Sequence, residues 1–203
     1  RDVRVQNPDA THICGLHGGE FYRVEVLDPT TRAPLPADVL AAKFQRVVEM
    51  GKQRRGSGSE DAPVPLAALT TMDRDAWADA YAELEATSTP GVLRHVVSGA
   101  LFHVALDTAH DLDATLSKKN AAVRAVLHGS GVNRWFDQAL TIIVGPNGEV
   151  GNNFEHSWGD GLSVLRWGHF CNDYVASHGG KISASASASA PAAAKPASVA
   201  VSG

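Results

Sequence analysis

The segment from Thr141 to Gly161 constrains the fold more than any other part of this 203-residue chain. Its first half holds an apolar run, then Pro-Asn-Gly-Glu at 146–149, and then a second run that starts at Val150. An Asn-Gly pair between apolar runs favours the tight turn of an antiparallel hairpin. The sequence therefore predicts two paired strands, the second of which ends at His156.

A helix is expected directly after this second strand. Apolar residues recur near helical spacing from Leu162 to Tyr174, so the helix should begin around Asp160 and Gly161. His156 then stands on a short connector between two rigid elements, where catalytic groups are often held. A histidine titrates near neutrality, which suits a general base in a reversible group transfer. Asp160 is interpreted either as a direct partner of His156 or as one member of a structural ion pair, and Gly161 as the residue that lets the backbone turn tightly into the helix.

Strands and helices alternate through the rest of the chain. The predicted elements are a strand over 22–26, a helix after Pro36, a polar loop over 51–65, a helix capped by Asp73 with Trp77, Tyr81 and Leu84 buried, a strand over 100–106, and a helix over 114–127. Such alternation, with at least one hairpin, predicts an α/β (α+β) fold: a mixed sheet covered by helices.

The composition changes abruptly near the end of the chain. Residues 1–178 have the mixed composition of one domain, whereas residues 179–203 are rich in alanine, serine and proline. We expect this second segment to be a disordered, low-complexity tail. Because the chain opens at Arg1 and already resembles the interior of a domain, we also expect it to be one part of a longer protein.

Charge and cysteine content exclude several classes of function. The formal net charge of -4 and the isoelectric point near 6.1 argue against nucleic acid or an anionic membrane as the main partner. The two cysteines, Cys14 and Cys171, lack metal-type spacing and are interpreted as buried apolar residues in a reducing compartment. No apolar run approaches the roughly 20 residues that a membrane-spanning helix needs.

Three strings carry a family resemblance. They are PLAALTTMDRDAWADAYAEL at 65–84, LHGSGVNRWFD at 127–137, and NRWFDQALTIIVGPNGEVGNNFEHSWGDGLSVLRW at 133–167. Together they closely resemble the choline/carnitine acyltransferase family, with Gln138 where that family commonly has lysine. Within these strings, His156-x-x-x-Asp160-Gly161 resembles the HxxxDG motif of acyltransferases built on the chloramphenicol acetyltransferase fold. The form EHSWGDG looks most like the long-chain carnitine branch of the family.

The resemblance implies both a fold and a reaction. It implies part of the first lobe of a two-lobe protein, which transfers acyl groups between CoA and carnitine with His156 as the base and with Asp160 and Gly161 supporting the site. Acyl-CoA and carnitine would be the substrates, with no further cofactor and no metal. The groups that hold CoA, carnitine and the oxyanion are expected downstream of this chain. By resemblance alone, we expect a mitochondrial monomer, with any membrane contact made by parts outside the chain.

Two alternatives stay open at this point. The first is a truncated interaction module that keeps the family's sequence motifs but catalyses no reaction. Whichever function holds, we expect the isolated chain to be inactive and to expose apolar surface. A metal-dependent hydrolase would use Glu155, His156 and Asp160 as ligands. Independently of both, we expect Arg134 and Asp137 to form a buried ion pair, because a buried charge needs a partner.

Overall fold

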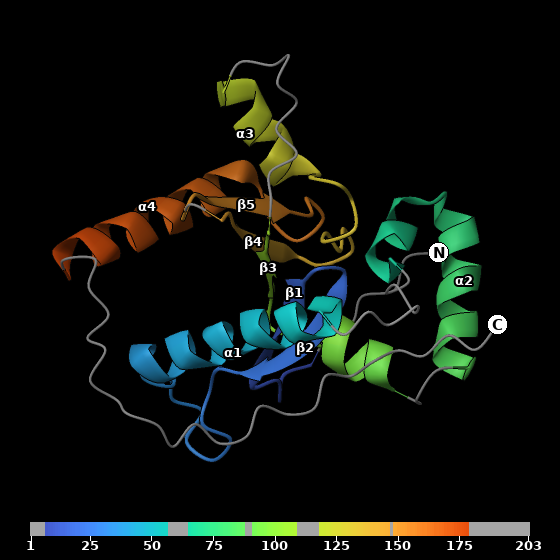
Figure 1. The fold of residues 1–203 in the computed structure, drawn as a ribbon, viewed down its shortest axis with the longest axis horizontal. Helices are drawn as coiled ribbons and strands as arrows, with labels where there is room; N and C mark the ends of the chain where they lie inside the picture. Colours follow the sequence, from blue (N-terminus) through green and yellow to red (C-terminus); the bar gives the residue numbers. More distant parts are fainter. Residues whose placement is uncertain (1–6, 57–64, 88–90, 109–117, 147, 179–203) are drawn as a thin grey trace.

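The computed structural model of the chain describes residues 7–56, 65–87, 91–108, 118–146 and 148–178, and it describes only the backbone at 54–56 and 118–119 (Figure 1). The tail predicted over 179–203 and the first four residues of the helix predicted over 114–127 lie outside these ranges. The described residues form a five-stranded mixed sheet flanked by helices, which confirms the predicted fold class.

The sheet has parallel strands in its centre and antiparallel strands at its two edges. In spatial order, its strands are β2 (Glu20–Glu25), β1 (His12–His17), β3 (His103–Leu106), β4 (Leu140–Val144) and β5 (Val150–Phe154). β1, β3 and β4 run parallel, whereas β2 pairs antiparallel with β1 and β5 pairs antiparallel with β4. Every residue of β1 is buried. This strand was not predicted from the sequence, because its apolar run is short, contains Gly15 and is bounded by two histidines.

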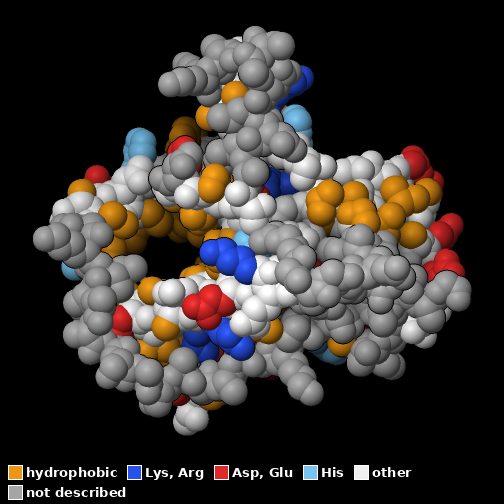
Figure 2. Space-filling view, in the orientation of Figure 1, with side chains coloured by type: hydrophobic (Ala, Val, Ile, Leu, Met, Phe, Trp, Pro, Cys, Tyr) orange, Lys and Arg blue, Asp and Glu red, His pale blue; other side chains and the backbone are white. Residues whose placement is uncertain are grey.

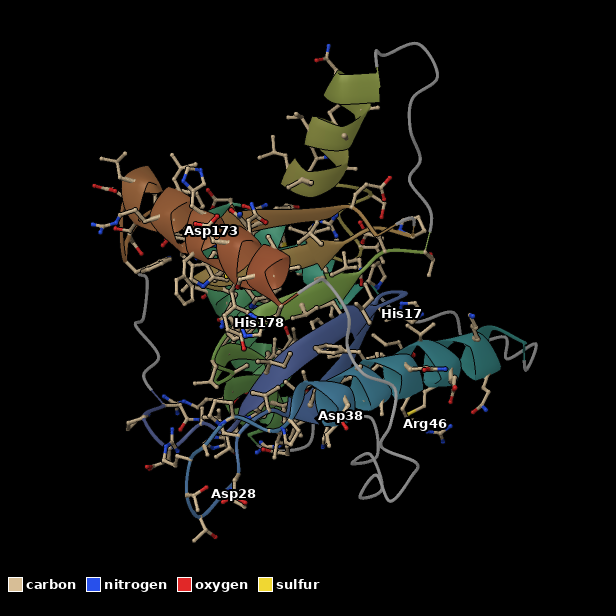
Figure 3. All side chains as sticks on the ribbon, turned by 90° about the vertical axis from the view of Figure 1, so that its left-hand side faces the viewer. His17, Asp28, Asp38, Arg46, Asp173 and His178 are labelled. Atoms are coloured by element: carbon tan, nitrogen blue, oxygen red, sulfur yellow. The ribbon has the colours of Figure 1, made fainter. Side chains whose placement is uncertain are left out.

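Helices cover both faces of the sheet (Figures 1 and 3). On one side lie α1 (Ala37–Gly56) and α4 (Gly161–Ser177), and on the other lie a 3₁₀ segment η1 (Leu66–Thr71), α2 (Arg74–Thr87) and a π-helical segment η2 (Leu93–Ser98). The remaining helix, α3 (Lys118–Leu127), stands beside β5. Because α1 continues to Gly56, the loop predicted from Gly51 is wrong over its first six residues. Gly51 itself lies against the ring of His17, where a Cβ atom would overlap the ring.

Each face of the sheet has its own apolar core. On the α1 side, Ile13, Val24 and Val104 pack with Val47. The core on the other side joins residues from several elements, among them Leu16, Phe21, Leu66, Trp77, Leu93, Trp135 and Ile143. The ring of Trp135 meets the rings of Phe21 and Trp77 edge to face, with 5.5 Å between centroids in each pair.

The helix predicted after Asp73 is confirmed. The Asp73 carboxylate accepts hydrogen bonds from the backbone N–H groups of Asp75 and Ala76, as an N-cap residue does. Trp77 and Leu84 are buried, and Tyr81 is half-buried.

The helix predicted after His156 begins where expected, and most of its large apolar side chains are exposed. Of the apolar residues that define its spacing, Val164 is buried, whereas Leu162 and Phe170 are 71% and 68% exposed. Figure 2 shows hydrophobic side chains around a hollow between α4 and α1. The expected exposure of apolar surface is therefore confirmed. None of the helices in the described ranges is long and apolar enough to cross a membrane.

Two buried histidines connect the centre of the sheet to η2. The ring Nε2 of His12 lies 3.2 Å from the carbonyl oxygen of Val96, and that of His103 lies 3.0 Å from the carbonyl oxygen of Val97. Because a carbonyl only accepts, each Nε2 must carry its hydrogen. Burial lowers the pKa of His103 from 6.5 to about 4 and also lowers the pKa of His12. Both imidazoles are therefore neutral in the folded chain near pH 7.

We expect His103 to make the fold sensitive to mild acid. Between pH 6.5 and pH 4 the unfolded chain binds a proton at His103 that the folded chain excludes. The contribution of the neutral His103 to the free energy of unfolding is therefore fully present above pH 6.5 and is lost as the pH drops toward 4. The lowered pKa corresponds to a loss of about 3 kcal/mol over this range. His103→Gln keeps a donor for Val97 and removes the titration, whereas the exposed His169→Gln is the matched control. Urea unfolding at several pH values measures the difference, and equal pH dependence in wild type and His103→Gln would contradict it.

Candidate active site

His156 lies on a tight turn between β5 and α4. The last residue pair of the hairpin joins Leu140 to Phe154, so β5 ends two residues before His156, and the prediction that the strand reaches His156 is wrong. The His156 side chain is exposed, and its ring lies beside that of Phe154, with 5.8 Å between the centroids. The imidazole is therefore held at the surface with one aromatic ring beside it, open to a reactant.

Hydrogen bonds fix the turn on both sides of His156. The backbone N–H of Glu155 donates to the carbonyl oxygen of Ala139 at 3.2 Å, and the indole N–H of Trp158 donates to the same oxygen at 2.6 Å. Inside the turn, the Glu155 carboxylate accepts from the backbone N–H of Ser157 at 2.9 Å and from its hydroxyl. The bond from the Ser157 hydroxyl is the largest influence on the Glu155 carboxyl, whose pKa lies below its ordinary value. Glu155 is thus an anion engaged within the turn.

Asp160 begins the helix that follows. Its carboxylate accepts hydrogen bonds from the backbone N–H groups of Leu162 at 2.8 Å and Ser163 at 3.2 Å, and its own backbone is extended. This is the geometry of an N-cap residue, and a carboxylate is also favoured at the positive end of a helix. Among the described residues, Asp160 is therefore neither a direct hydrogen-bond partner of His156 nor a member of an ion pair. Its supporting role at the site stays a prediction.

Gly161 is the first residue of α4. It is not among the glycines with positive φ, and a Cβ atom added to it would meet no atom within 4 Å. The backbone shown here therefore does not require glycine at this position, and the supporting role of Gly161 at the site stays a prediction.

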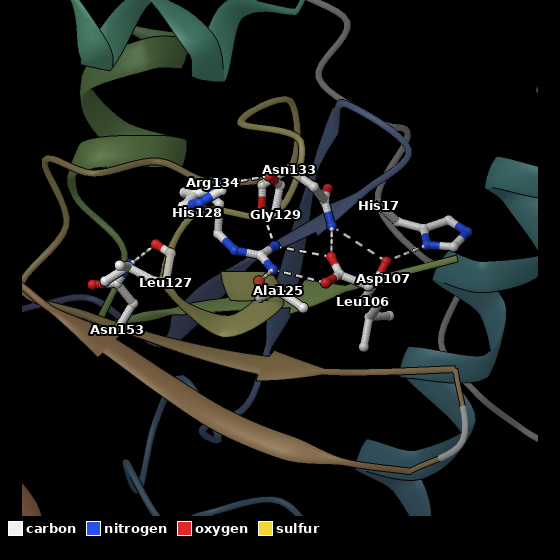
Figure 4. A network of polar contacts seen from close by, with 10 residues as sticks. All are labelled: His17, Leu106, Asp107, Ala125, Leu127, His128, Gly129, Asn133, Arg134 and Asn153. Atoms are coloured by element: carbon white, nitrogen blue, oxygen red, sulfur yellow. Dashed lines mark hydrogen bonds and ion pairs between the residues drawn. The ribbon is translucent and has the colours of Figure 1, made fainter. Parts of the chain in front are cut away.

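A buried ion pair joins the residue after β3 to the segment that precedes β4 (Figure 4). The guanidinium of Arg134 donates to both carboxylate oxygens of Asp107, at 2.9 and 2.7 Å, and also to the carbonyl oxygens of Asn133 and Ala125. The predicted pairing of Arg134 with Asp137 is wrong. Asp137 instead accepts from the Arg74 guanidinium at 2.8 Å and from the Trp77 indole.

Further hydrogen bonds connect this region to strands β1 and β5. The Asn133 side-chain amide donates to Asp107 and to the carbonyl of Leu106, which also lies 2.9 Å from the His17 ring nitrogen Nδ1. In β5, the side-chain amide of Asn153 donates to the carbonyl of Leu127, the last residue of α3, at 2.7 Å. The strand that leads to His156 is thus joined by a hydrogen bond to the end of α3, whose Ala125 carbonyl is held by Arg134 (Figure 4).

Two features limit the chemistry that this region supports alone. A cavity lined by Thr141, Asn153, Phe154 and neighbouring residues has room for about one water molecule, so it does not hold an organic substrate. Within the described ranges, no three histidine, cysteine or carboxylate side chains lie close enough to hold a metal ion. Glu155 and Asp160, the ligands of the hydrolase alternative, are engaged with Ser157 and with the start of α4.

Two residues of this region, Trp158 and Asp107, were not predicted from the sequence. Trp158 donates to a backbone carbonyl nineteen positions away, and a carbonyl leaves no signal in a sequence. Asp107 had a usable signal: it directly follows the predicted strand over 100–106, at the carboxyl end of a parallel strand, where polar side chains from neighbouring strands meet.

Comparisons with known proteins agree with the resemblance in the sequence. The model of a family described as Choline/Carnitine o-acyltransferase matches residues 1–200. Carnitine O-palmitoyltransferase 2, mitochondrial, from Homo sapiens is 35% identical over 168 residues, which are 82% of this chain and 23% of that protein. Carnitine O-palmitoyltransferase 1, muscle isoform, from Bos taurus is 34% identical over 164 residues, which are 78% of this chain and 20% of that protein. The chain spans less than a quarter of the length of these relatives. Because the family model matches nearly all of it, the chain belongs to the choline/carnitine O-acyltransferase family.

Proposed function

We propose that the protein carrying this chain is a carnitine O-acyltransferase that moves long-chain acyl groups between CoA and carnitine, with His156 as the general base. The observation that carries the proposal is the exposed imidazole on a hydrogen-bonded turn, in a chain of this family. The long-chain preference is supported by the names of the relatives, which are carnitine palmitoyltransferases.

In the proposed reaction, His156 takes the proton of the carnitine hydroxyl as that oxygen attacks the thioester carbon of acyl-CoA. The carbon–sulfur bond then breaks, and the CoA thiolate leaves with the proton that the imidazole returns. The products are acylcarnitine and free CoA, so a single base serves both directions. Such a transfer needs both substrates held in line and a donor for the developing oxyanion. We propose that groups outside the described residues supply these.

The family and the relatives also support proposals for the location and the substrates of the protein. A mitochondrial location is supported by the name of the human relative, and acyl-CoA and carnitine are the proposed partners. We further propose that the protein needs no separate cofactor and acts as a monomer. Because the chain spans less than a quarter of its relatives, we expect the 203-residue chain alone to be inactive, and the assay requires the full-length gene product.

We expect the full-length protein to release CoA from palmitoyl-CoA only when carnitine is present. A thiol reagent that absorbs on reaction with CoA measures the rate, and omission of carnitine is the control. Acetyl-CoA in place of palmitoyl-CoA tests acyl length, and choline in place of carnitine tests the acceptor. CoA release that is equally fast without any acceptor would identify a thioesterase and contradict the proposal. Stoichiometric bound metal required for that release would instead favour the hydrolase alternative.

A further inference from the structure

The carbonyl oxygen of Ala139 receives hydrogen bonds from both sides of the candidate base. Glu155, immediately before His156, donates its backbone N–H at 3.2 Å, and Trp158, two residues after it, donates its indole N–H at 2.6 Å. A carbonyl oxygen has two lone pairs and accepts both donors. His156 and Ser157 therefore lie within a short loop of chain that is closed at its two ends on one atom.

Ala139 is itself held in place by its neighbours. Gln138, which precedes it, is buried and donates its side-chain amide to the carbonyl of Ala100 at 3.0 Å. Leu140, which follows it, begins β4 and pairs with Phe154. The acceptor shared by Glu155 and Trp158 thus lies directly before β4, between two residues that are themselves held in place by hydrogen bonds.

Burial does not account for the tryptophan at this position. Trp158 is 48% exposed, so its ring gains only part of the stability that a buried aromatic side chain would gain. Nor does the indole bond extend the strand ladder, which already ends with the Glu155 N–H. The indole N–H instead connects Trp158, on the C-terminal side of the turn, to the carbonyl of Ala139 and so fixes the distance between them. A phenylalanine would keep an aromatic ring here, but a smaller one, and would not make this bond.

We infer that Trp158 is a positioning residue for His156: its indole N–H, bonded to the carbonyl of Ala139, closes the turn that presents the imidazole. The inference rests on the proposed function, in which His156 is the base. A general base must lie within hydrogen-bond reach of the proton that it removes, and a displacement of about 1 Å can cost up to about 100-fold in rate. Trp158 touches neither substrate in this scheme and acts only through the placement of His156.

Trp158→Phe in the full-length protein tests the inference. We expect kcat for carnitine-dependent CoA release to fall about tenfold, while KM for palmitoyl-CoA and for carnitine stays within about twofold. Trp167→Phe, on α4, is the matched control and should leave both constants unchanged. Site-specific replacement of Trp158 by 5-fluorotryptophan keeps the N–H and should keep the rate. Replacement by 3-benzothienylalanine removes only the N–H and should reproduce the loss.

A measurement that needs no activity separates this inference from the proposed function. Trp158→Phe should speed hydrogen exchange at the Glu155 and Ser157 amides about tenfold, and leave exchange at Ile142 in β4 unchanged. The inference is overturned if kcat and exchange are both unchanged, if the benzothienyl variant is as fast as the fluorotryptophan variant, or if Trp167→Phe loses as much rate. If the wild-type protein shows no carnitine-dependent transfer, the proposed function fails, and unchanged exchange in Trp158→Phe would still overturn the closing role of the indole.

Discussion

Replacement of His156 by alanine is expected to lower carnitine-dependent CoA release by about 10² to 10⁴-fold, the range that a general base contributes. The imidazole is exposed, and its ring contact is with Phe154 alone among the described residues, so its removal leaves no buried group without a partner. The unfolding free energy should therefore change by no more than about 0.5 kcal/mol. A large loss of rate without loss of stability is the pattern that separates a catalytic role from a structural one.

The control for this variant is His169→Ala, which removes a second exposed histidine from α4 and should leave the rate unchanged. Stopped-flow or steady-state thiol release gives the rate, and urea unfolding gives the stability. If His156→Ala retains more than about a tenth of the wild-type kcat, another group is the base and the mechanism proposed for this family member is wrong. If His156→Ala and His169→Ala lose rate equally, the loss is a general effect of removing an exposed histidine from this region and does not identify His156 as the base.

The hairpin and the start of α4 are predictable from the sequence because their signals are local. Asn-Gly between two apolar runs sets the turn, and Gly148 has a φ of +85°, which glycine adopts easily. Asp160 followed by an apolar repeat marks a helix start in the same way, since the cap bonds reach only two and three residues ahead. Features of this kind need no knowledge of the rest of the chain.

The pairing of segments that are distant in the sequence was not predicted. β1 pairs parallel with β3, some ninety positions later, and nothing in the string HICGLH indicates that partner. The sequence predicts Asp137, three residues away, as the partner of Arg134, whereas the partner in the structure is Asp107, directly after β3. A residue's need for a partner is visible in the sequence, whereas the identity of that partner depends on the topology.

The packing of α4 shows a related limit. Apolar residues at helical spacing indicate a face that gains from burial, but they do not say what covers it. Leu162 and Phe170 remain exposed in the structure, although apolar residues at this spacing commonly face a core. Periodicity therefore predicts the helix, whereas the exposure of its apolar residues agrees with the separate expectation that this chain leaves apolar surface uncovered.

Replacement of Arg134 by methionine is expected to lower the unfolding free energy by about 3 to 5 kcal/mol, the largest stability effect predicted for this chain. The side chains of Arg134 and Asp107 are 2% and 11% exposed, so water does not replace the lost guanidinium. Asp107 would keep only the Asn133 amide as a described donor, and the Ala125 carbonyl would lose the Arg134 bond. Methionine has a similar length, which limits the contribution of a simple cavity.

The matched control is Arg46→Met on α1 (Figure 3), where the guanidinium lies 3.5 Å from Glu49 and both side chains are about half exposed. An exposed pair of this kind contributes about 0 to 1 kcal/mol, so this variant should unfold close to the wild type. Arg134→Lys distinguishes charge from geometry, because an ammonium keeps the charge but does not donate to both Asp107 oxygens in parallel.

We expect the lysine variant to lie between the wild type and Arg134→Met. Urea unfolding at constant m value measures all three variants. A loss of less than about 1 kcal/mol in Arg134→Met would show that the carboxylate of Asp107 finds water or another donor when the guanidinium is gone. The network would then be a consequence of how β3, α3 and the hairpin pack, and not one of the forces that holds them together.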